Sequence, residues 1–363
     1  MFLSKIHTFT YRNLEELHLD ASLGIHGIIG KNGVGKTNIL DSIYYLAFCK
    51  SNIATSDTQN VMHGYDSFSI QGLFEHDSTS YKIHCGYRAS TKEKTIVCND
   101  TKYTKFSDHI GLIPLVFVSP ADMILINGGG SERRKFIDAY ISLYNKEYLQ
   151  NLLTYNKLLA QRNALLKQGR VDATYISIID EQLADASTAI FTIRNQEIQE
   201  LSELVSALYS KIATSEECML AYQSQLHDTS ALQGLQRNLE KDSILSFTSF
   251  GIHRDDIDFM FNDIGIKHAG SQGQKKSFLL ALKFAQYQII QRKTGVLPIL
   301  LLDDLFDKLD KERTSKVFDV IEGEEFGQIF ITDTDKMLLH TFFEARKQTG
   351  NFHMFEDGVL HRL

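Results

Sequence analysis

Residues 30–37 read GKNGVGKT, and no other stretch of this sequence restricts the possible folds as strongly. They fit the pattern Gly-x4-Gly-Lys-Ser/Thr, which needs a strand before it and a helix after it. Both are expected, because the apolar run GIHGIIG ends at Gly30 and TNILDSIYYLAFC follows with one apolar helix face. The pattern predicts a phosphate-binding loop in an α/β fold, with a plain glycine turn as the alternative.

The loop residues have separate expected roles. Backbone amides from Asn32 to Thr37 would surround a β-phosphate, since a glycine-rich helix start presents its N–H groups to anions. Lys36 would reach the β- and γ-phosphate oxygens, and the Thr37 hydroxyl would bind Mg²⁺. The expected nucleotide-binding residues of this loop are Gly30, Lys31, Asn32, Gly33, Val34, Gly35, Lys36, Thr37 and Asn38. The loop thus predicts a magnesium-nucleotide site.

A second motif, PILLLDD at residues 298–304, is an apolar run that ends in two carboxylates. A buried strand with acidic residues at its end is the natural partner of a phosphate loop, because it holds Mg²⁺ against the phosphates. Asp303 is expected at the metal through a water, and Asp304 is expected to orient or deprotonate the attacking water. Asp304 and Lys36 are the predicted catalytic residues, whereas Thr37 and Asp303 are the predicted metal residues. Alternatively, both carboxylates only cap the following segment.

A second glycine-rich helix start, AGSQGQKKS, occupies residues 269–277. Together with the two motifs above it resembles the ABC-type ATPases, whose signature has the pattern Ser-x-Gly-Gln. In that family the signature binds nucleotide held by a second head. The resemblance implies that Ser271, Gly273 and Gln274 bind the γ-phosphate of ATP on a partner chain. The alternative is a capped helix, with Ser271 or Gln272 closing its first turn.

The period of the apolar residues changes along the chain. Strand-like alternation in the first 30 residues and in residues 66–120 predicts a mixed sheet with few helices. From Ser131 the period is helical up to Ile212, with a polar break at KQGRVD (167–172), which predicts an antiparallel helical arm. Strand patterns return in ILSFTSFGIHRDDIDFMF, LPILLLDD and QIFITD, and helices are expected at 277–292 and 311–321. The predicted domains are an ATPase head formed by residues 1–130 and 246–363, and an inserted helical arm at 131–245.

Composition excludes several classes of protein. The longest uninterrupted apolar stretch, 296–302, is far shorter than the roughly 18 residues that cross a bilayer. Four cysteines form no CxxC pair, which argues against a zinc site and fits a reducing cytoplasm, and thirteen histidines show no HExxH spacing, so no histidine-ligated metal is expected. The net charge of −7 predicts that any DNA contact is local. The candidate basic patches are residues 90–105 and SERRKF at 131–136, and for each one alone a solvated face is favoured over a DNA site.

Four further stretches resemble the RecF family of bacterial recombination mediator ATPases. They are TYRN (10–13), VSPADMILINGGGSERRKFID (118–138), GIHRDDIDF (251–259) and LLLDDLFDKLD (300–310). The resemblance implies an ABC-type P-loop ATPase head, a mixed sheet with helices, with an inserted all-helical arm domain. It implies ATP and Mg²⁺ as cofactors, an ATP-dependent homodimer that clamps DNA at gaps and stalled replication forks, and RecR and RecO as partners. It also implies slow, DNA-stimulated ATP hydrolysis and adds Arg12 to the nucleotide-binding residues.

Other ABC-type ATPases are the alternatives. A head of the chromosome-structuring or Rad50 type needs hundreds of coiled-coil residues or a zinc hook, and a transporter subunit usually has a switch histidine where Thr332 and Asp333 stand here. A defence ATPase would need an effector domain for which no stretch is left. Asp122 is the only candidate for the glutamine loop, and Arg254 and Asp255 are expected in an ion-pair network rather than in catalysis.

Overall fold

The computed structural model describes residues 1–168, 173–213, 217–304, 310–323, 326–334, 351–356 and 358–362. The chain forms two compact units, each considered by itself below: unit 1 comprises Met1–Asp122 and Gln286–Leu363, and unit 2 comprises Met123–Ala285. Unit 2 is therefore wider than the predicted arm at 131–245. None of the described helices combines the length and the apolarity that crossing a membrane requires.

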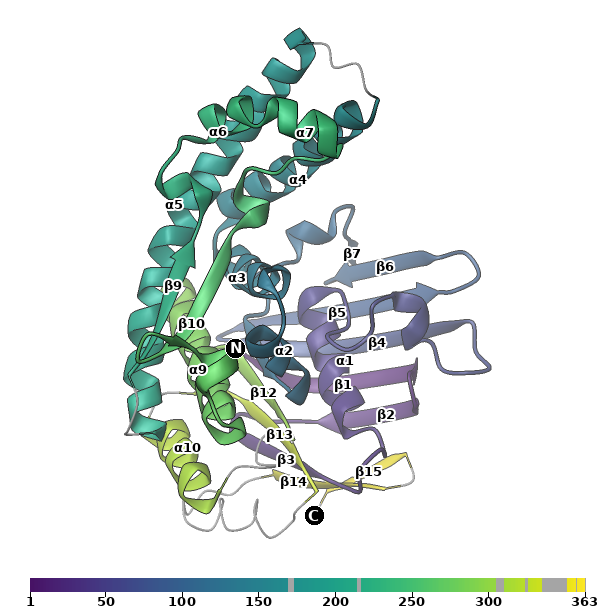
Figure 1. Ribbon diagram of the computed structural model, residues 1–363. Helices are drawn as coiled ribbons and strands as arrows, with labels where there is room; N and C mark the ends of the chain where they lie inside the picture. Colours follow the sequence, from purple (N-terminus) through teal and green to yellow (C-terminus); the bar gives the residue numbers. More distant parts are fainter. Residues whose placement is uncertain are drawn as a thin grey trace. The chain divides into compact units, whose positions relative to one another are not determined.

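Unit 1 contains an antiparallel sheet with the strand order β2-β1-β4-β5-β6-β7 (Figure 1). Its long strands alternate buried and exposed residues, because successive side chains point to opposite faces and only one face packs on the core. The strands are β1 (Phe2–Tyr11), β2 (Leu14–Asp20), β4 (Ser67–His76), β5 (Thr79–Arg88), β6 (Glu93–Cys98) and β7 (Thr101–Lys102).

A second sheet in unit 1 has the order β15-β14-β3-β13-β12-β8 and is parallel except for β15. Every residue of β3, β12 and β13 is buried, as expected for parallel strands covered on both faces. The strands are β3 (Ile25–Ile29), β8 (Leu115–Val118), β12 (Ile299–Asp303), β13 (Ile329–Asp333), β14 (Asn351–Glu356) and β15 (Val359–Arg362). The predicted mixed α/β head with helices is thus confirmed, and its strands divide between an antiparallel sheet and a mostly parallel one.

Helix α1 (Lys36–Phe48) contacts strands of both sheets, and its apolar residues join them in one core. Helix α10 (Lys311–Gly323) and the 3-10 turns η1 (Asp57–Asn60), η2 (Phe106–Asp108) and η3 (Pro120–Met123) complete the described regular structure of this part of the chain. Helix α9 (Gln272–Thr294) begins in unit 2 and ends in unit 1. The expected helices at 277–292 and 311–321 are therefore confirmed.

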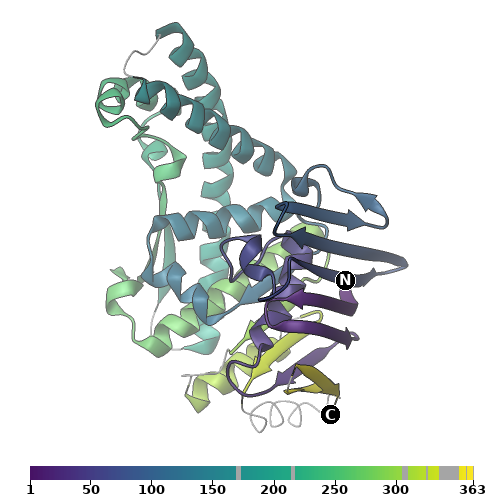
Figure 2. The same ribbon diagram turned by 90° about the vertical axis from the view of Figure 1, so that its right-hand side faces the viewer.

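Unit 2 is mainly helical, with α3 (Gly130–Tyr144) and α4 (Lys146–Lys167), and its longest helix, α5 (Ala173–Ile212), has 40 residues (Figures 1 and 2). Arg162 of α4 bonds Asp180 of α5, whereas Tyr148 of α4 bonds Arg194 of α5, so the two helices run antiparallel as predicted. Asn145 caps α4 by accepting a hydrogen bond from the Tyr148 N–H at 2.9 Å, which separates α3 from α4. The predicted break at 167–172 lies mostly outside the described residues.

Unit 2 also contains a small antiparallel sheet with the order β11-β10-β9. The strand pattern expected over 244–261 is wrong up to Asp255, because α7 and a 3-10 turn precede β10. The elements are α2 (Ile124–Asn127), α3 (Gly130–Tyr144), α4 (Lys146–Lys167), α5 (Ala173–Ile212), β9 (Cys218–Gln223), η4 (Gln225–His227), α6 (Ala231–Arg237), α7 (Leu239–Leu245), η5 (Ile252–Arg254), β10 (Asp256–Phe261), β11 (Ile264–Gly265) and α8 (Ile266–Ala269).

A buried ion-pair cluster in unit 2 leads to a stability prediction. The fully buried guanidinium of Arg162 donates to Asp180 and to Asp242, each at 2.6 Å. Arg162→Ala leaves two buried carboxylates without their cation, so we expect a loss of about 3–5 kcal/mol in the free energy of unfolding. Urea unfolding followed by helical circular dichroism measures this loss. The same change at exposed Arg237 should cost less than about 0.5 kcal/mol; equal losses would contradict the assignment.

A buried histidine pair in unit 1 leads to a pH prediction. His353 of β14 stacks on His26 of β3, and burial, with smaller effects of His26 and Arg362, lowers the pKa of His353 to about 4. As the pH falls below the unfolded value of 6.5, only the unfolded chain binds this proton, so stability falls. Between pH 7 and pH 5, we expect the free energy of unfolding to fall by about 2 kcal/mol less in His353→Gln than in the wild type. Urea unfolding at both pH values checks this, and exposed His361→Gln should retain the wild-type loss.

Candidate nucleotide-binding and signature sites

The phosphate loop lies between β3 and α1, as the sequence predicts. Gly33 and Gly35 have φ values of 80° and 121°, a left-handed region that side chains other than glycine rarely adopt. A Cβ at Gly35 would also lie 2.6 Å from the side chain of Asn13. The buried ammonium of Lys36 donates to the carbonyls of Gly30 at 2.8 Å and Lys31 at 3.0 Å, so it lies across the loop that would hold the phosphates.

The turn between β1 and β2 reaches this loop through a residue that the sequence analysis missed. Asn13 donates from Nδ2 to the carbonyl of Val34 at 2.8 Å and accepts from Asn38 at 2.6 Å. The neighbouring Arg12 has a φ of 57° and donates to the Asn60 side chain at 3.3 Å. In the sequence, Asn13 stood out only as the neighbour of Arg12 in TYRN. Its contact with the phosphate loop becomes visible only once β1 and β2 are paired and the turn between them is placed.

Asp303 meets the phosphate loop at the end of β12. Its carboxylate accepts from the Thr37 hydroxyl, at 3.0 Å to Oδ1 and 2.9 Å to Oδ2, and from the Thr332 hydroxyl at 2.6 Å. Burial raises the pKa of Asp303 above its usual range, against the hydrogen bonds from Thr332 and Thr37. A buried carboxylate beside a hydroxyl is an oxygen donor set of the kind Mg²⁺ prefers, and a cation would compensate for the burial of its charge. The residues present therefore fit the predicted metal.

The structure shows the contacts of Thr332, which stands at the switch position, and of Asp122, the candidate for the glutamine loop. Thr332 joins both acidic residues, because it donates to Asp303 and accepts at 3.2 Å from the backbone N–H of Asp304, a residue with a φ of 47°. Asp122 accepts from the backbone N–H of Ser119 at 2.8 Å, so it closes the turn after β8. Residues 305–309 of LLLDDLFDKLD lie outside the described residues.

The SQGQ motif belongs to unit 2 and forms a capping box at the start of α9. The Ser271 hydroxyl accepts from the backbone N–H of Gln274 at 3.2 Å, and the Gln274 side chain accepts from the N–H of Ser271 at 2.7 Å. Lys275 donates to the carbonyl of Lys267, while Ser271 remains exposed. The capped helix is confirmed; the binding of a partner's phosphate by Ser271, Gly273 and Gln274 stays a prediction.

The candidate DNA-binding patch SERRKF has intramolecular partners for its charged side chains, and DNA binding by it stays a prediction. Arg133 donates to both carboxylate oxygens of Asp256, at 2.7 and 2.9 Å, and its side chain is only 12% exposed. Arg134 donates to the carbonyl of Asp255, and Lys135 pairs with Glu132 at 2.9 Å. The Arg133 charge is therefore compensated within unit 2, and replacing Arg133 would primarily weaken the fold, whereas Lys135 remains largely exposed.

The other basic stretch, residues 90–105, also has partners of its own. Lys94 pairs with Asp57 at 2.9 Å, whereas Lys92 and Lys105 are exposed.

In unit 2, buried Asp255 accepts hydrogen bonds from Arg194 at 3.0 Å and from the Tyr222 hydroxyl, which confirms that Asp255 belongs to an ion-pair network. Arg254 instead donates to a backbone carbonyl and lies over the ring of Phe247.

Comparison with known proteins agrees with this geometry. The RecF/RecN/SMC N-terminal domain family model matches residues 2–356. The "DNA replication and repair protein RecF" of Bacteroides thetaiotaomicron is 42% identical over 366 residues, covering 100% of this chain and 99% of that protein. The protein of that name from Flavobacterium johnsoniae is 42% identical over 354 residues, 96% and 98% of the two chains.

Solved structures extend the likeness to three dimensions. The recombination mediator protein RecF-ATP of the RecFOR pathway has a TM-score of 0.89 at 30% identity, covering 100% of this chain and 97% of that chain. An Smc head bound to the C-terminal winged-helix domain of ScpA has a TM-score of 0.59 at 16% identity, with 100% and 98% coverage, and shows the fold alone. Full-length identity above 40% to proteins named RecF, together with the matching head fold, places this chain in the RecF family.

Proposed function

We propose that this chain is an ATP-dependent DNA-binding protein of the RecF kind, whose heads pair on ATP and clamp DNA during repair of gaps and stalled replication. The hydrogen bond from Thr37 to Asp303 carries the proposal, because it joins the phosphate loop to the acidic strand end across 266 positions of sequence. The names of the full-length relatives, DNA replication and repair proteins, support the process. The RecFOR pathway named for the similar ATP-bound structure supports RecR and RecO as partners.

Different residues of unit 1 bind the triphosphate, bind Mg²⁺ and activate the attacking water. The loop amides from Gly30 to Asn38, Lys36 and Arg12 bind the triphosphate, and Thr37 and Asp303 hold Mg²⁺. When bound, the metal supplies positive charge to the β- and γ-phosphates. Asp304 orients the attacking water and accepts its proton, which makes the chain a slow ATPase.

The second half of each nucleotide site comes from the partner chain. Ser271, Gly273 and Gln274 contact the γ-phosphate bound by the other head, where the exposed start of α9 offers backbone N–H groups to an anion. ATP thereby links two chains, and hydrolysis releases them. The clamp needs few basic residues, because closure around DNA adds to local phosphate contacts on an otherwise acidic chain.

DNA binding measured with and without ATP across a salt series tests this function. We expect binding to gapped DNA that requires ATP and weakens steadily as salt rises, since each phosphate contact releases counterions. Lys36→Ala with ATP should behave like the wild type without nucleotide. Equal affinity with and without ATP would contradict the clamp, and an affinity independent of salt would contradict phosphate contacts.

A further inference from the structure

The outer face of the β1–β2 pair brings together two histidines and a glutamate that have no part in the nucleotide site. The strand register pairs His7 with His18 and Phe9 with Glu16. Directly opposed residues share a face of the sheet, as do residues two apart on one strand, so His7, Glu16 and His18 lie on the same face. His7 is half-buried, and the other two are exposed.

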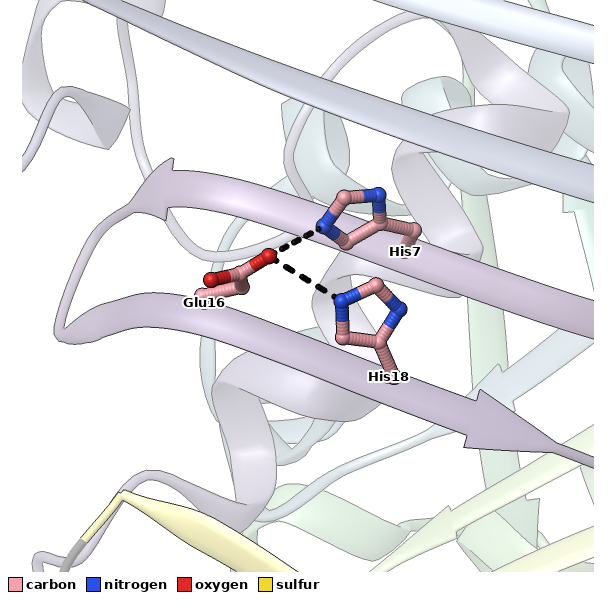
Figure 3. A group of neighbouring side chains, drawn as sticks. All are labelled: His7, Glu16 and His18. Carbon is pink, nitrogen blue, oxygen red and sulfur yellow. Dashed lines mark hydrogen bonds and ion pairs between the residues drawn. The ribbon is translucent and has the colours of Figure 1, made fainter.

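The three ligand atoms converge on one point. Figure 3 shows both Nε2 atoms directed at the same carboxylate oxygen, Oε1 of Glu16, which lies 3.2 Å from His7 and 3.0 Å from His18. The two rings stack with centroids 3.8 Å apart, and all three ligand atoms lie within 4.8 Å of one another. Ligands bound at 2.0–2.1 Å to tetrahedral zinc are about 3.3 Å apart, so the side chains already have nearly the required spacing.

The chemistry of this cluster selects the type of metal. Two imidazole nitrogens and a carboxylate are ligands for zinc and its neighbours in the transition series, whereas Mg²⁺ prefers oxygen alone. Three protein ligands leave a coordination position for water.

We propose that His7, Glu16 and His18 form a Zn²⁺ site, separate from the magnesium-nucleotide site. Zinc would replace the hydrogen bonds to Glu16 and link β1 to β2. The turn of this strand pair carries Asn13, which donates to the Val34 carbonyl in the phosphate loop at 2.8 Å. Zinc binding therefore stabilises the strand pair that contacts the loop, because a metal that binds only the folded chain raises its stability.

Calorimetric titration of the nucleotide-free full chain with zinc chloride at pH 7.5 tests the proposal. We expect one site per chain that His7→Gln with His18→Gln removes and that Glu16→Gln weakens by more than about tenfold. The matched control is His63→Gln with His361→Gln, which removes two other exposed histidines and should bind zinc like the wild type. Zinc should raise the melting temperature of the wild type and the control only.

X-ray absorption of the zinc-loaded wild type identifies the ligands directly. The expected spectrum has two imidazole nitrogens and oxygen ligands at about 2.0–2.2 Å, without a sulfur shell at about 2.3 Å. A sulfur shell would assign the zinc to cysteine and overturn the proposal. Unchanged affinity in the folded His7, His18 double variant would equally show that the cluster is only a hydrogen-bonded group, and so would the absence of zinc binding by the wild type.

Discussion

Lys36→Ala should abolish tight ATP binding, lowering the affinity by at least roughly 100-fold, since hydrogen bonds to charged groups contribute about 1.5–3 kcal/mol and we propose that this ammonium contacts two phosphates. The side chain is buried across the loop, within 3.0 Å of the carbonyls of Gly30 and Lys31, and its removal leaves the backbone cradle without its cation. Titration with a fluorescent ATP analogue measures the loss. Lys102→Ala, at an exposed lysine of β7, is the control and should bind like the wild type.

Asp304→Asn separates binding from hydrolysis at the same site. We expect near wild-type ATP affinity but hydrolysis slower by about 10²–10⁴-fold, because the amide keeps the shape of the side chain and cannot accept the proton. The variant should accumulate as an ATP-bound dimer. Hydrolysis at the wild-type rate would show that Asp304 is not the base and would move that role to another residue.

Ser271→Arg should prevent ATP-dependent dimerisation while leaving ATP binding by each chain nearly intact. The phosphate loop lies in unit 1 and is untouched, whereas the start of α9 would carry a bulky side chain where the partner's γ-phosphate must approach. Sedimentation with and without ATP measures the dimer, and the ATPase rate should fall with it.

Ser271→Ala is the matched control for the lost helix cap. Both variants lose the hydroxyl that accepts from the Gln274 N–H, which costs about 1 kcal/mol of helix stability, but only arginine fills the approach to the phosphate. We expect the alanine variant to retain weakened dimerisation. If Ser271→Arg dimerises like the wild type, the motif is only a capped helix.

The local pattern of the sequence correctly predicted a strand before and a helix after the GKNGVGKT loop, and a buried strand at PILLLDD, because each of these is a continuous element. The apolar runs before Gly30 and Asp303 form β3 and β12, which run parallel in one sheet with only β13 between them, so their carboxyl ends lie at the same edge. Contact of Thr37 with Asp303 follows from that arrangement. The same reasoning predicted the antiparallel packing of helices α4 and α5, because each has an apolar face that must be buried against another element.

What could not be predicted depends on pairing between distant segments. Arg133 looked like a DNA contact because its carboxylate partner, Asp256, lies 123 positions away. His7 and His18 form a cluster only through the register of β1 against β2, which a search for helical metal spacings does not detect. The division of the strands between two sheets needed the structure, because alternation shows that a strand has one solvated face, but not which strands share a sheet.

Mixing Ser271→Arg with Lys36→Ala tests the composite site most directly. One of the two sites in a mixed dimer would combine an intact phosphate loop with an intact signature, while the other would carry both defects. Sedimentation with ATP should therefore show weak mixed dimers, with partial ATPase activity if one site suffices, although neither variant pairs alone. A mixture that stays monomeric, or a Ser271→Arg variant that dimerises without its partner, would contradict ATP-linked pairing of two heads.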